Sequence, residues 1–284
     1  MDRRAVRVGA VTVAAVLIST VLGSTGAWAA PVPMAGEVYV ALGDSSAAGP
    51  GILPQLTLDP CWRSARNYPH VAASLLGVSV LRDVTCSGAR TDHMTQSQSG
   101  VAPQFDALTP DTMLVTLSIG GNDTGLISLG ESCVRLNPFE RPCYYDNVVN
   151  GVDLVQQRID AYAPKLAGAL AGIKERAPQA RIFVVGYGLY LRRNGCWPTQ
   201  PVVPIDANYV QGKVDYLNQI TAREAAAAGA TYVDIRTPGA GHDTCASSSN
   251  RWLEGFIPGS VAAPLHPNAN GMQAFGQIVA AAAR

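Results

Sequence analysis

Short, continuous apolar runs alternate with longer stretches of helical spacing along most of this 284-residue chain. The apolar runs cover residues 37–42, 78–84, 113–119, 181–186 and 231–234. We expect each run to form a buried strand. Strands that are apolar on both faces and separated by helices are typical of a parallel sheet with helices on both sides. The pattern therefore predicts an α/β fold, a three-layer α/β/α sandwich with a mainly parallel sheet.

The stretches with helical spacing cover residues 68–76, 152–177, 208–228 and 271–283. Hydrophobic residues make up 48% of the chain and charged residues only 15%, which indicates a packed globular protein and excludes disorder as the main state. No internal repeat, low-complexity linker or shift in composition divides the chain. We therefore expect a single domain.

The N-terminal segment has the order of a secretory signal peptide. Three arginines precede an apolar stretch, and the small residues Ala27 and Ala29 favour cleavage after Ala29. We predict a signal peptide over residues 1–29 and one folded domain over residues 30–284, secreted to the extracellular space or the cell envelope. The uncharged stretch over residues 8–30 is also long enough to span a bilayer, so a retained anchor is the alternative.

Six cysteines in an exported chain indicate three disulfides. Fifteen pairings are possible in principle, and pairing of neighbours in the sequence closes the shortest loops. This order predicts the bonds Cys61–Cys86, Cys133–Cys143 and Cys196–Cys245. A zinc site is the alternative, but no CxxC pair or HExxH motif occurs. We expect no metal and no other cofactor.

The charges of the chain exclude one large class of partner. The sequence has 21 basic and 21 acidic residues, and no basic cluster occurs beyond its first residues. A protein that binds nucleic acid by its phosphates needs a basic patch. We therefore expect no nucleic-acid partner.

Polar motifs that contain glycine follow the first three predicted strands, and a further polar motif lies near the C-terminus. They are Gly43-Asp44-Ser45, Ser87-Gly88-Ala89, Gly121-Asn122-Asp123 and His266-Pro267-Asn268. Ligands of open parallel sheets bind beyond the carboxyl ends of the strands, so we expect the first three motifs to lie together. The first motif is not the GxSxG elbow of α/β-hydrolases, because Ala47 occupies the position of the second glycine.

These four motifs, in this order, resemble those of the SGNH hydrolases, also called GDSL esterases and lipases, which have a flavodoxin-like α/β/α fold. The resemblance runs from residue 38 to the closing helix and is closest to secreted actinobacterial enzymes with three disulfides. It implies hydrolysis of acyl esters through an acyl-enzyme, with Ser45 as nucleophile and His266 as general base. It also implies an oxyanion hole formed by the backbone N–H groups of Ser45 and Gly88 and the side-chain amide of Asn122.

Three other histidines compete with His266 for the role of base. His70 lies in a helical stretch, His93 lies in a polar loop, and His242 lies in a loop close to Cys245. Only His266 matches the last motif of the family and precedes the closing helix. We therefore assign the role to His266.

One position departs from the family pattern. The common pattern has an acidic residue three positions before the histidine, where this chain has Ala263. Either a main-chain carbonyl near Ala263 accepts the Nδ1–H of His266, or another acid such as Asp243 reaches it. We favour the carbonyl and hence a Ser-His dyad, because a carbonyl can also hold the imidazole in one tautomer.

The sequence is less informative about the substrate, because the motifs indicate ester hydrolysis while specificity lies in the loops. We expect a monomer that acts on a small-molecule or lipid ester, with contact to a lipid surface as a further expectation. Leu53, Leu56, Leu58 and residues 126–129 are candidates for an acyl groove. The alternatives are a hydrolase of thioesters or acetylated glycans and a secreted binding or adhesion domain without turnover.

Overall fold

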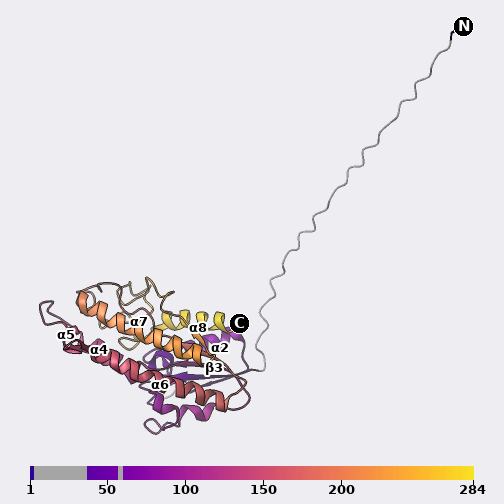
Figure 1. The fold of residues 1–284 in the computed structure, drawn as a ribbon, viewed down its shortest axis with the longest axis horizontal. Coiled ribbons are helices and arrows are strands. Elements are labelled where there is room, and N and C mark those ends of the chain that lie inside the picture. The colour runs from indigo at the N-terminus through magenta and orange to yellow at the C-terminus, as the bar shows by residue number, and fades with distance from the viewer. Residues whose placement is uncertain (3–36, 57–59) are drawn as a thin grey trace. The chain divides into compact units, whose positions relative to one another are not determined.

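The computed structural model describes residues 1–2, 37–56 and 60–284. Apart from Met1 and Asp2, the predicted signal peptide lies outside the described residues. From Glu37 onward the described chain falls in one compact unit, as the sequence predicts (Figure 1). No helix within the described ranges is long and apolar enough to cross a membrane.

A five-stranded parallel sheet forms the centre of the fold. Its strands lie in the order β2 (Val80–Asp83), β1 (Val38–Gly43), β3 (Thr112–Ser118), β6 (Arg181–Val185) and β7 (Thr231–Val233). All six residues of β1 are buried, because helices cover both faces of the sheet there. The five predicted strands and their parallel arrangement are thus confirmed.

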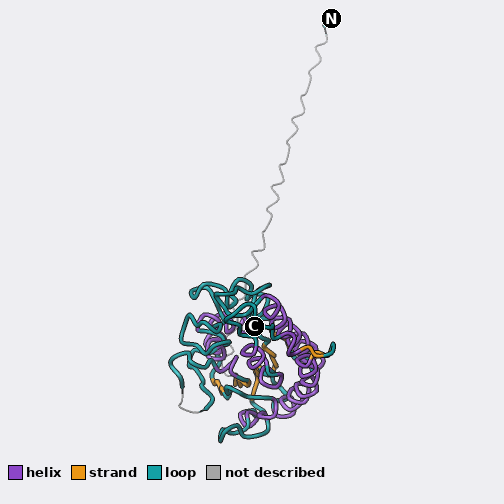
Figure 2. The backbone as a smooth tube through the Cα atoms, turned by 90° about the vertical axis from the view of Figure 1, so that its left-hand side faces the viewer, coloured by secondary structure: helices purple, strands orange, loops and turns teal. Residues whose placement is uncertain are grey.

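Four long helices cover the sheet. Helix α2 (Tyr68–Leu76) packs against α8 (Ala269–Ala283), and α6 (Leu154–Arg176) packs against α7 (Pro204–Ala227). Right-handed crossovers between parallel strands place the first pair on one face and the second pair on the other. Figure 2 shows the strands enclosed by these helices and by long loops. The three layers of the predicted sandwich are therefore present.

Local sequence features decide where several helices begin. The side chain of Asn268 accepts a hydrogen bond from the N–H of Gly271 at 3.0 Å, so α8 begins at Ala269, two residues before the predicted start. Helix α7 begins at Pro204 instead of residue 208, because proline in a first turn lacks only an N–H that has no partner inside the helix.

The shortest elements were not predicted, because they are too brief to show a periodic pattern in the sequence. They are α1 (Ser45–Ala48), the 3₁₀ helices η1 (Thr91–Met94) and η2 (Gln104–Ala107), α3 (Gly121–Thr124), α4 (Leu126–Ser132), α5 (Tyr144–Asn147) and the antiparallel pair β4 (Val148–Val149) and β5 (Val152–Asp153). Most of them lie in the connections that follow the strands.

The six cysteines form the disulfides Cys61–Cys86, Cys133–Cys143 and Cys196–Cys245. These are the three pairs that the order of the cysteines predicts. Each bond ties down loop structure outside the long helices, where little apolar core is available to hold the chain.

The strand order places a crevice at the carboxyl ends of β1 and β3. The chain leaves β1 toward β2 on one side and then returns to β3 on the other side of β1. The last residues of β1 and β3, Gly43 and Ser118, are paired in register. Such a reversal of direction opens the space in which α/β proteins bind their ligands.

Candidate active site

A tight turn at the end of β1 presents Ser45. The N–H and the carbonyl of Gly43 both hydrogen-bond the buried side-chain amide of Gln104, at 2.8 and 2.9 Å. Gly43 has φ +149°, and a Cβ atom there would lie 2.5 Å from the carbonyl oxygen of Ser118. Only glycine fits this position. Asp44 then caps α1 by accepting from Ser46 N–H, which makes Ser45 the first helical residue.

The side chains of Ser45 and His266 meet although 221 positions separate them. The Nε2 atom of His266 lies 2.7 Å from Oγ of Ser45, and its Nδ1 atom lies 2.7 Å from the carbonyl oxygen of Pro264. A carbonyl can only accept, so Nδ1 carries the proton and Nε2 is left to accept the hydroxyl proton of Ser45. Burial lowers the pKa of His266 below its ordinary value of 6.5, while the Pro264 carbonyl opposes this shift.

The group that holds Nδ1 is the carbonyl of Pro264, the residue after Ala263. The other candidate, Asp243, is buried and lies in a different network. Its carboxylate accepts from Arg192 Nε at 3.0 and 3.1 Å and from the N–H of Cys245 at 2.8 Å. The geometry thus agrees with a carbonyl near Ala263 and not with Asp243 as the group that orients the imidazole.

Helix α3 brings Asn122 to the same crevice. One N–H of its amide donates to the carbonyl of Ala89 at 2.9 Å, and the neighbouring carboxylate of Asp123 accepts from Thr91 Oγ1 at 2.6 Å. These two bonds tie α3 to the loop that contains Gly88. In the described ranges neither the N–H of Ser45 nor that of Gly88 donates to another backbone group. The backbone–backbone hydrogen bonds of the described residues thus leave these two N–H groups unused.

A buried hydrogen-bonded pair at the cavity joins Asp44, a residue of the first motif, to Tyr187, which belongs to no motif. The hydroxyl of Tyr187 donates to Asp44 Oδ2 and accepts from the N–H of Gly121, both at 2.6 Å. Burial raises the pKa of Asp44 to about 7, although its bonds from Tyr187 and Ser46 lower it. Tyr187 thus connects the turn of Ser45 with the turn of Asn122. The only sequence signal for Tyr187 was its position directly after a predicted strand.

Glu254, whose side chain is fully buried, stabilises the loop that contains His266 by hydrogen bonds. Its backbone N–H donates to the carbonyl of His266 at 2.9 Å, and its carbonyl accepts from the N–H of Leu265 at 3.0 Å. Its carboxylate accepts from Gly259 N–H at 2.6 Å and from Asn268 Nδ2 at 2.9 Å. Burial alone would raise the pKa of Glu254, but these bonds lower it. No motif in the sequence signals this support.

The other histidines are engaged elsewhere. The ring of His70 lies 2.8 Å from the side chain of Asn67, and His93 accepts from a backbone N–H at 3.0 Å. His242 stacks on Trp252 with ring centroids 4.2 Å apart. None of these hydrogen bonds or ring contacts involves Ser45, so His266 alone among the four contacts it. In the part of the chain that the structure describes, no group of three or more His, Cys, Asp or Glu residues could hold a metal ion.

A cavity that is partly open to solvent extends from Ser45 and Asn122. Its walls are largely apolar and include Leu126 and Ile127 from α4, Val210 and Val214 from α7, and Phe256 and Leu265 from the loops. A cavity with apolar walls and a few polar groups at one end is suited to an organic ligand with one polar reacting group.

Only some of the candidate groove residues lie at this cavity, and Ser128 and Leu129 are not among its lining residues. Leu126 and Ile127 line the cavity. Leu53 and Leu56 do not line it and are 64% and 46% exposed, because the loop after α1 points them into solvent. Leu58 lies outside the described residues.

Comparison with known proteins agrees with this geometry. The chain is 39% identical to lipase 2 of Streptomyces coelicolor over 280 residues, which cover 93% of this chain and 92% of that protein. It is 32% identical to lipase 1 of the same organism over 242 residues, or 84% of each chain. The similarity therefore spans almost the whole sequence.

Solved structures show the same fold. The extracellular lipase from Streptomyces rimosus has a TM-score of 0.68 and 29% identity, and phospholipase A1 from Streptomyces albidoflavus NA297 has a TM-score of 0.68 and 26% identity. Each comparison covers 87% of this chain and 99% of the other. Residues 41–274 match the GDSL-like Lipase/Acylhydrolase family. The chain belongs to this family, whose members are also known as SGNH hydrolases, and is a carboxylic ester hydrolase.

Proposed function

We propose that this protein is a secreted serine esterase or lipase that cleaves acyl esters through a Ser-His dyad and an acyl-enzyme. The observation that carries the proposal is the 2.7 Å contact between Ser45 Oγ and His266 Nε2 at the polar end of an apolar cavity. A serine hydroxyl becomes an effective nucleophile when an adjacent imidazole takes its proton.

In the first half of the reaction, Ser45 Oγ attacks the ester carbonyl while Nε2 of His266 takes the hydroxyl proton. The tetrahedral oxyanion accepts hydrogen bonds from the N–H groups of Ser45 and Gly88 and from the amide of Asn122. His266 then gives the proton to the departing alcohol, which leaves an acyl group on Ser45. In the second half, water attacks this acyl group, and His266 moves one proton from the water to Ser45.

A carbonyl in place of the third catalytic acid is sufficient for this cycle. The bond from Nδ1–H to the carbonyl of Pro264 holds the tautomer that leaves Nε2 free to accept. The carbonyl stabilises the imidazolium less than a carboxylate would. Burial of His266 favours the neutral imidazole that accepts a proton from Ser45, and the bond to the Pro264 carbonyl opposes this effect only in part, so the pKa of His266 stays below its ordinary value.

The apolar cavity supports an ester with a hydrocarbon acyl chain as substrate. The chain would lie between α4 and α7 with its carbonyl beside Ser45. The similar proteins include lipases and a phospholipase A1, which agrees with such substrates. Thioesters and acetylated glycans are the alternative substrates, and a binding domain without turnover is the alternative class of protein.

Three disulfides and an N-terminal signal-like sequence support export of the protein with removal of residues 1–29. The similar lipase from Streptomyces rimosus is extracellular, which agrees with this location. We also propose that the mature protein is a monomer.

An organophosphonate probe tests the proposed function. We expect the probe to label wild-type protein at Ser45, as mapped by peptide mass spectrometry, and to leave Ser45→Ala unlabelled. The rate of labelling should fall toward acid pH as His266 is protonated, with a midpoint below 6.5 because burial lowers this pKa. A folded wild-type protein that resists the probe would support the binding-domain alternative.

The variant Asp243→Asn tests whether the enzyme uses a Ser-His dyad or a conventional triad with Asp243 as its acid. Removal of the acid of a serine-protease triad lowers kcat by about 10⁴-fold. Here we expect Asp243→Asn to lose far less, because Asp243 bonds Arg192 and the N–H of Cys245 and not His266. The measurement is kcat on a p-nitrophenyl ester, with thermal unfolding as a check of folding. A loss of about 10⁴-fold in a folded variant would assign Asp243 as the third catalytic residue.

A further inference from the structure

The loop between α4 and α5 exposes two large apolar side chains. Leu136 is 81% exposed and Phe139 is 93% exposed, the latter being the most exposed aromatic side chain in the described residues. Single exposed apolar residues are common on soluble proteins. Two of them lie three positions apart here, in one short loop that is firmly held at its base.

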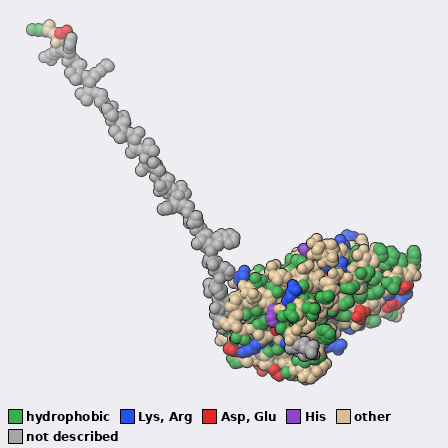
Figure 3. All heavy atoms as spheres, turned by 180° about the vertical axis from the view of Figure 1, so that it is seen from behind, with side chains coloured by type: hydrophobic (Ala, Val, Ile, Leu, Met, Phe, Trp, Pro, Cys, Tyr) green, Lys and Arg blue, Asp and Glu red, His purple; other side chains and the backbone are tan. Residues whose placement is uncertain are grey.

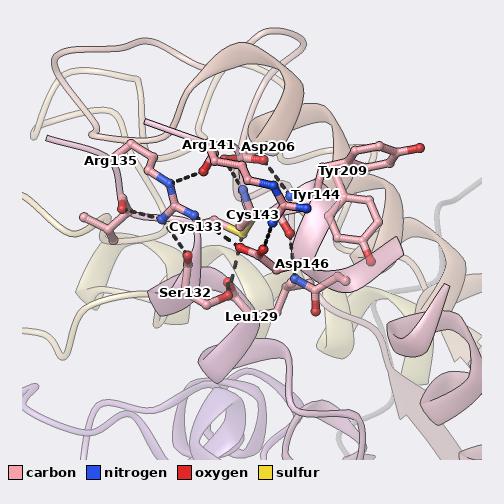
Figure 4. The surroundings of a disulfide bond; sticks show 12 residues. Leu129, Ser132, Cys133, Arg135, Arg141, Cys143, Tyr144, Asp146, Asp206 and Tyr209 are labelled. Carbon is pink, nitrogen blue, oxygen red and sulfur yellow. Dashed lines mark hydrogen bonds and ion pairs between the residues drawn. A yellow bond between two sulfur atoms is a disulfide. The ribbon is translucent and has the colours of Figure 1, made fainter. Parts of the chain in front are cut away.

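The bonds at the base of the loop are shown in Figure 4. The disulfide Cys133–Cys143 closes the loop, and Arg135 donates to the carbonyls of Ser132 and Arg141 at 2.8 and 2.9 Å. At the far end, the carboxylate of Asp206 accepts from the N–H groups of Cys143 and Tyr144, at 3.0 and 2.9 Å. A loop braced in this way holds its apolar side chains out in solvent.

The same loop forms part of the surroundings of the apolar cavity. It continues directly from α4, whose residues Leu126, Ile127 and Gly130 line the cavity. The N–H of Arg135 donates to the carbonyl of Pro201 at 2.6 Å, between the cavity residues Gln200 and Val202. The exposed apolar loop is therefore continuous with the wall of the cavity that begins at Ser45.

Ile257 is a further exposed apolar residue, and it is hydrogen-bonded to the segment of residues 200–202 that contacts the loop. Ile257 is 53% exposed and follows Phe256, which lines the cavity. Its N–H and carbonyl both bond the amide of Gln200, at 3.1 and 3.2 Å. In Figure 1, α4 and α5 lie at one end of the ribbon. Figure 3 shows the molecule from behind, with hydrophobic side chains on the surface at this end.

We propose that Leu136, Phe139 and Ile257 form a docking surface that inserts into the surface of an aggregated lipid and brings the cavity against it. This inference rests on the proposed hydrolysis of acyl esters, since a lipid surface is where long-chain esters are presented to the enzyme. The apolar side chains leave water on docking, which is the driving force for such insertion.

The charges of the loop favour a neutral or zwitterionic lipid surface. Arg135 and Arg141 are balanced by Glu140 and Asp146, and Asp146 forms an ion pair with Arg141. Without a net positive charge the loop has no electrostatic preference for anionic lipids. Binding should therefore depend on the apolar side chains and change little with salt.

The test compares two double variants with wild-type protein. Leu136→Ser with Phe139→Ser removes two of the three proposed docking side chains. Leu75→Ser with Val80→Ser is the matched control, because these residues are 41% and 43% exposed on α2 and β2, outside the cavity wall. Binding to phosphatidylcholine vesicles is measured by sedimentation, and kcat/KM is measured on soluble p-nitrophenyl acetate and on emulsified triglyceride.

We expect the loop variant to lose at least about tenfold in vesicle binding and in activity on the emulsion, while kcat/KM on the soluble ester stays within about twofold of wild type. The control variant should behave as wild type in all three assays. Unchanged vesicle binding by the loop variant would overturn the proposal. The proposal would also be overturned if wild-type protein bound only anionic vesicles and lost this binding in salt. It would likewise be overturned if light scattering showed that the loop substitutions convert a dimer to a monomer.

The vesicle assay also separates this inference from the proposed function. If wild-type protein binds vesicles through the loop but hydrolyses neither ester, the docking surface stands and the esterase function fails. If it hydrolyses the soluble ester but binds no phosphatidylcholine vesicle, the esterase function stands and the docking surface is rejected.

Discussion

Ser45→Ala is expected to lower kcat by at least about 10³-fold, His266→Ala should do the same, and the double variant should be little worse than either. The two side chains act as one unit, since the 2.7 Å contact between Oγ and Nε2 is the path of the proton. Once either partner is missing, the other has nothing further to contribute. Steady-state kinetics on a soluble p-nitrophenyl ester measures this directly.

His242→Ala is a suitable control for this series, because His242 is another loop histidine and bonds Asn250 and stacks on Trp252. It should retain nearly full kcat. Losses that multiply in the Ser45 and His266 double variant would show that the two residues act independently, and the dyad would then be rejected.

Asn122→Ala is expected to lower kcat by roughly 10²-fold or more with little change in KM. The amide of Asn122 would meet the oxyanion, whose charge develops only as the transition state forms. The variant also loses the bond from Asn122 to the carbonyl of Ala89, so its thermal stability has to be measured beside its kinetics.

Thr91→Val provides the matched control for Asn122. It removes the 2.6 Å bond between Thr91 Oγ1 and Asp123, which joins the same two loops, and leaves the amide of Asn122 in place. We expect a much smaller loss of kcat in this variant. An equal loss in the two variants, or a change in KM alone for Asn122→Ala, would mean that Asn122 holds the loop and does not act on the oxyanion.

The sequence by itself was sufficient for the order and type of the main elements. Burial on both faces gives a strand such as β1 a continuous apolar run, and caps such as Asn268 act on residues within one helical turn. Such signals depend on neighbours in the chain and can be read locally. The motifs that contain Ser45, Asn122 and His266 were recognisable for the same reason, because each is a short segment at the end of a strand or before a helix.

Only the tertiary structure decided how these segments meet. The choice of Pro264 over Asp243 as the partner of His266 depends on where a loop turns, and Asp243 is already bound to Arg192, 51 positions away. The bond between Tyr187 and Asp44 spans 143 positions and follows from the strand order that places β6 beyond β3.

The cavity could not be predicted from the sequence for a related reason. Its walls come from α4, α7 and several loops, and whether a leucine faces the cavity or solvent depends on the packing of all of them. Leu126 and Leu53 are alike as residues in predicted loops, yet only Leu126 lines the cavity. Local patterns specify which segments are buried, whereas the contacts between distant segments arise only when the whole chain packs.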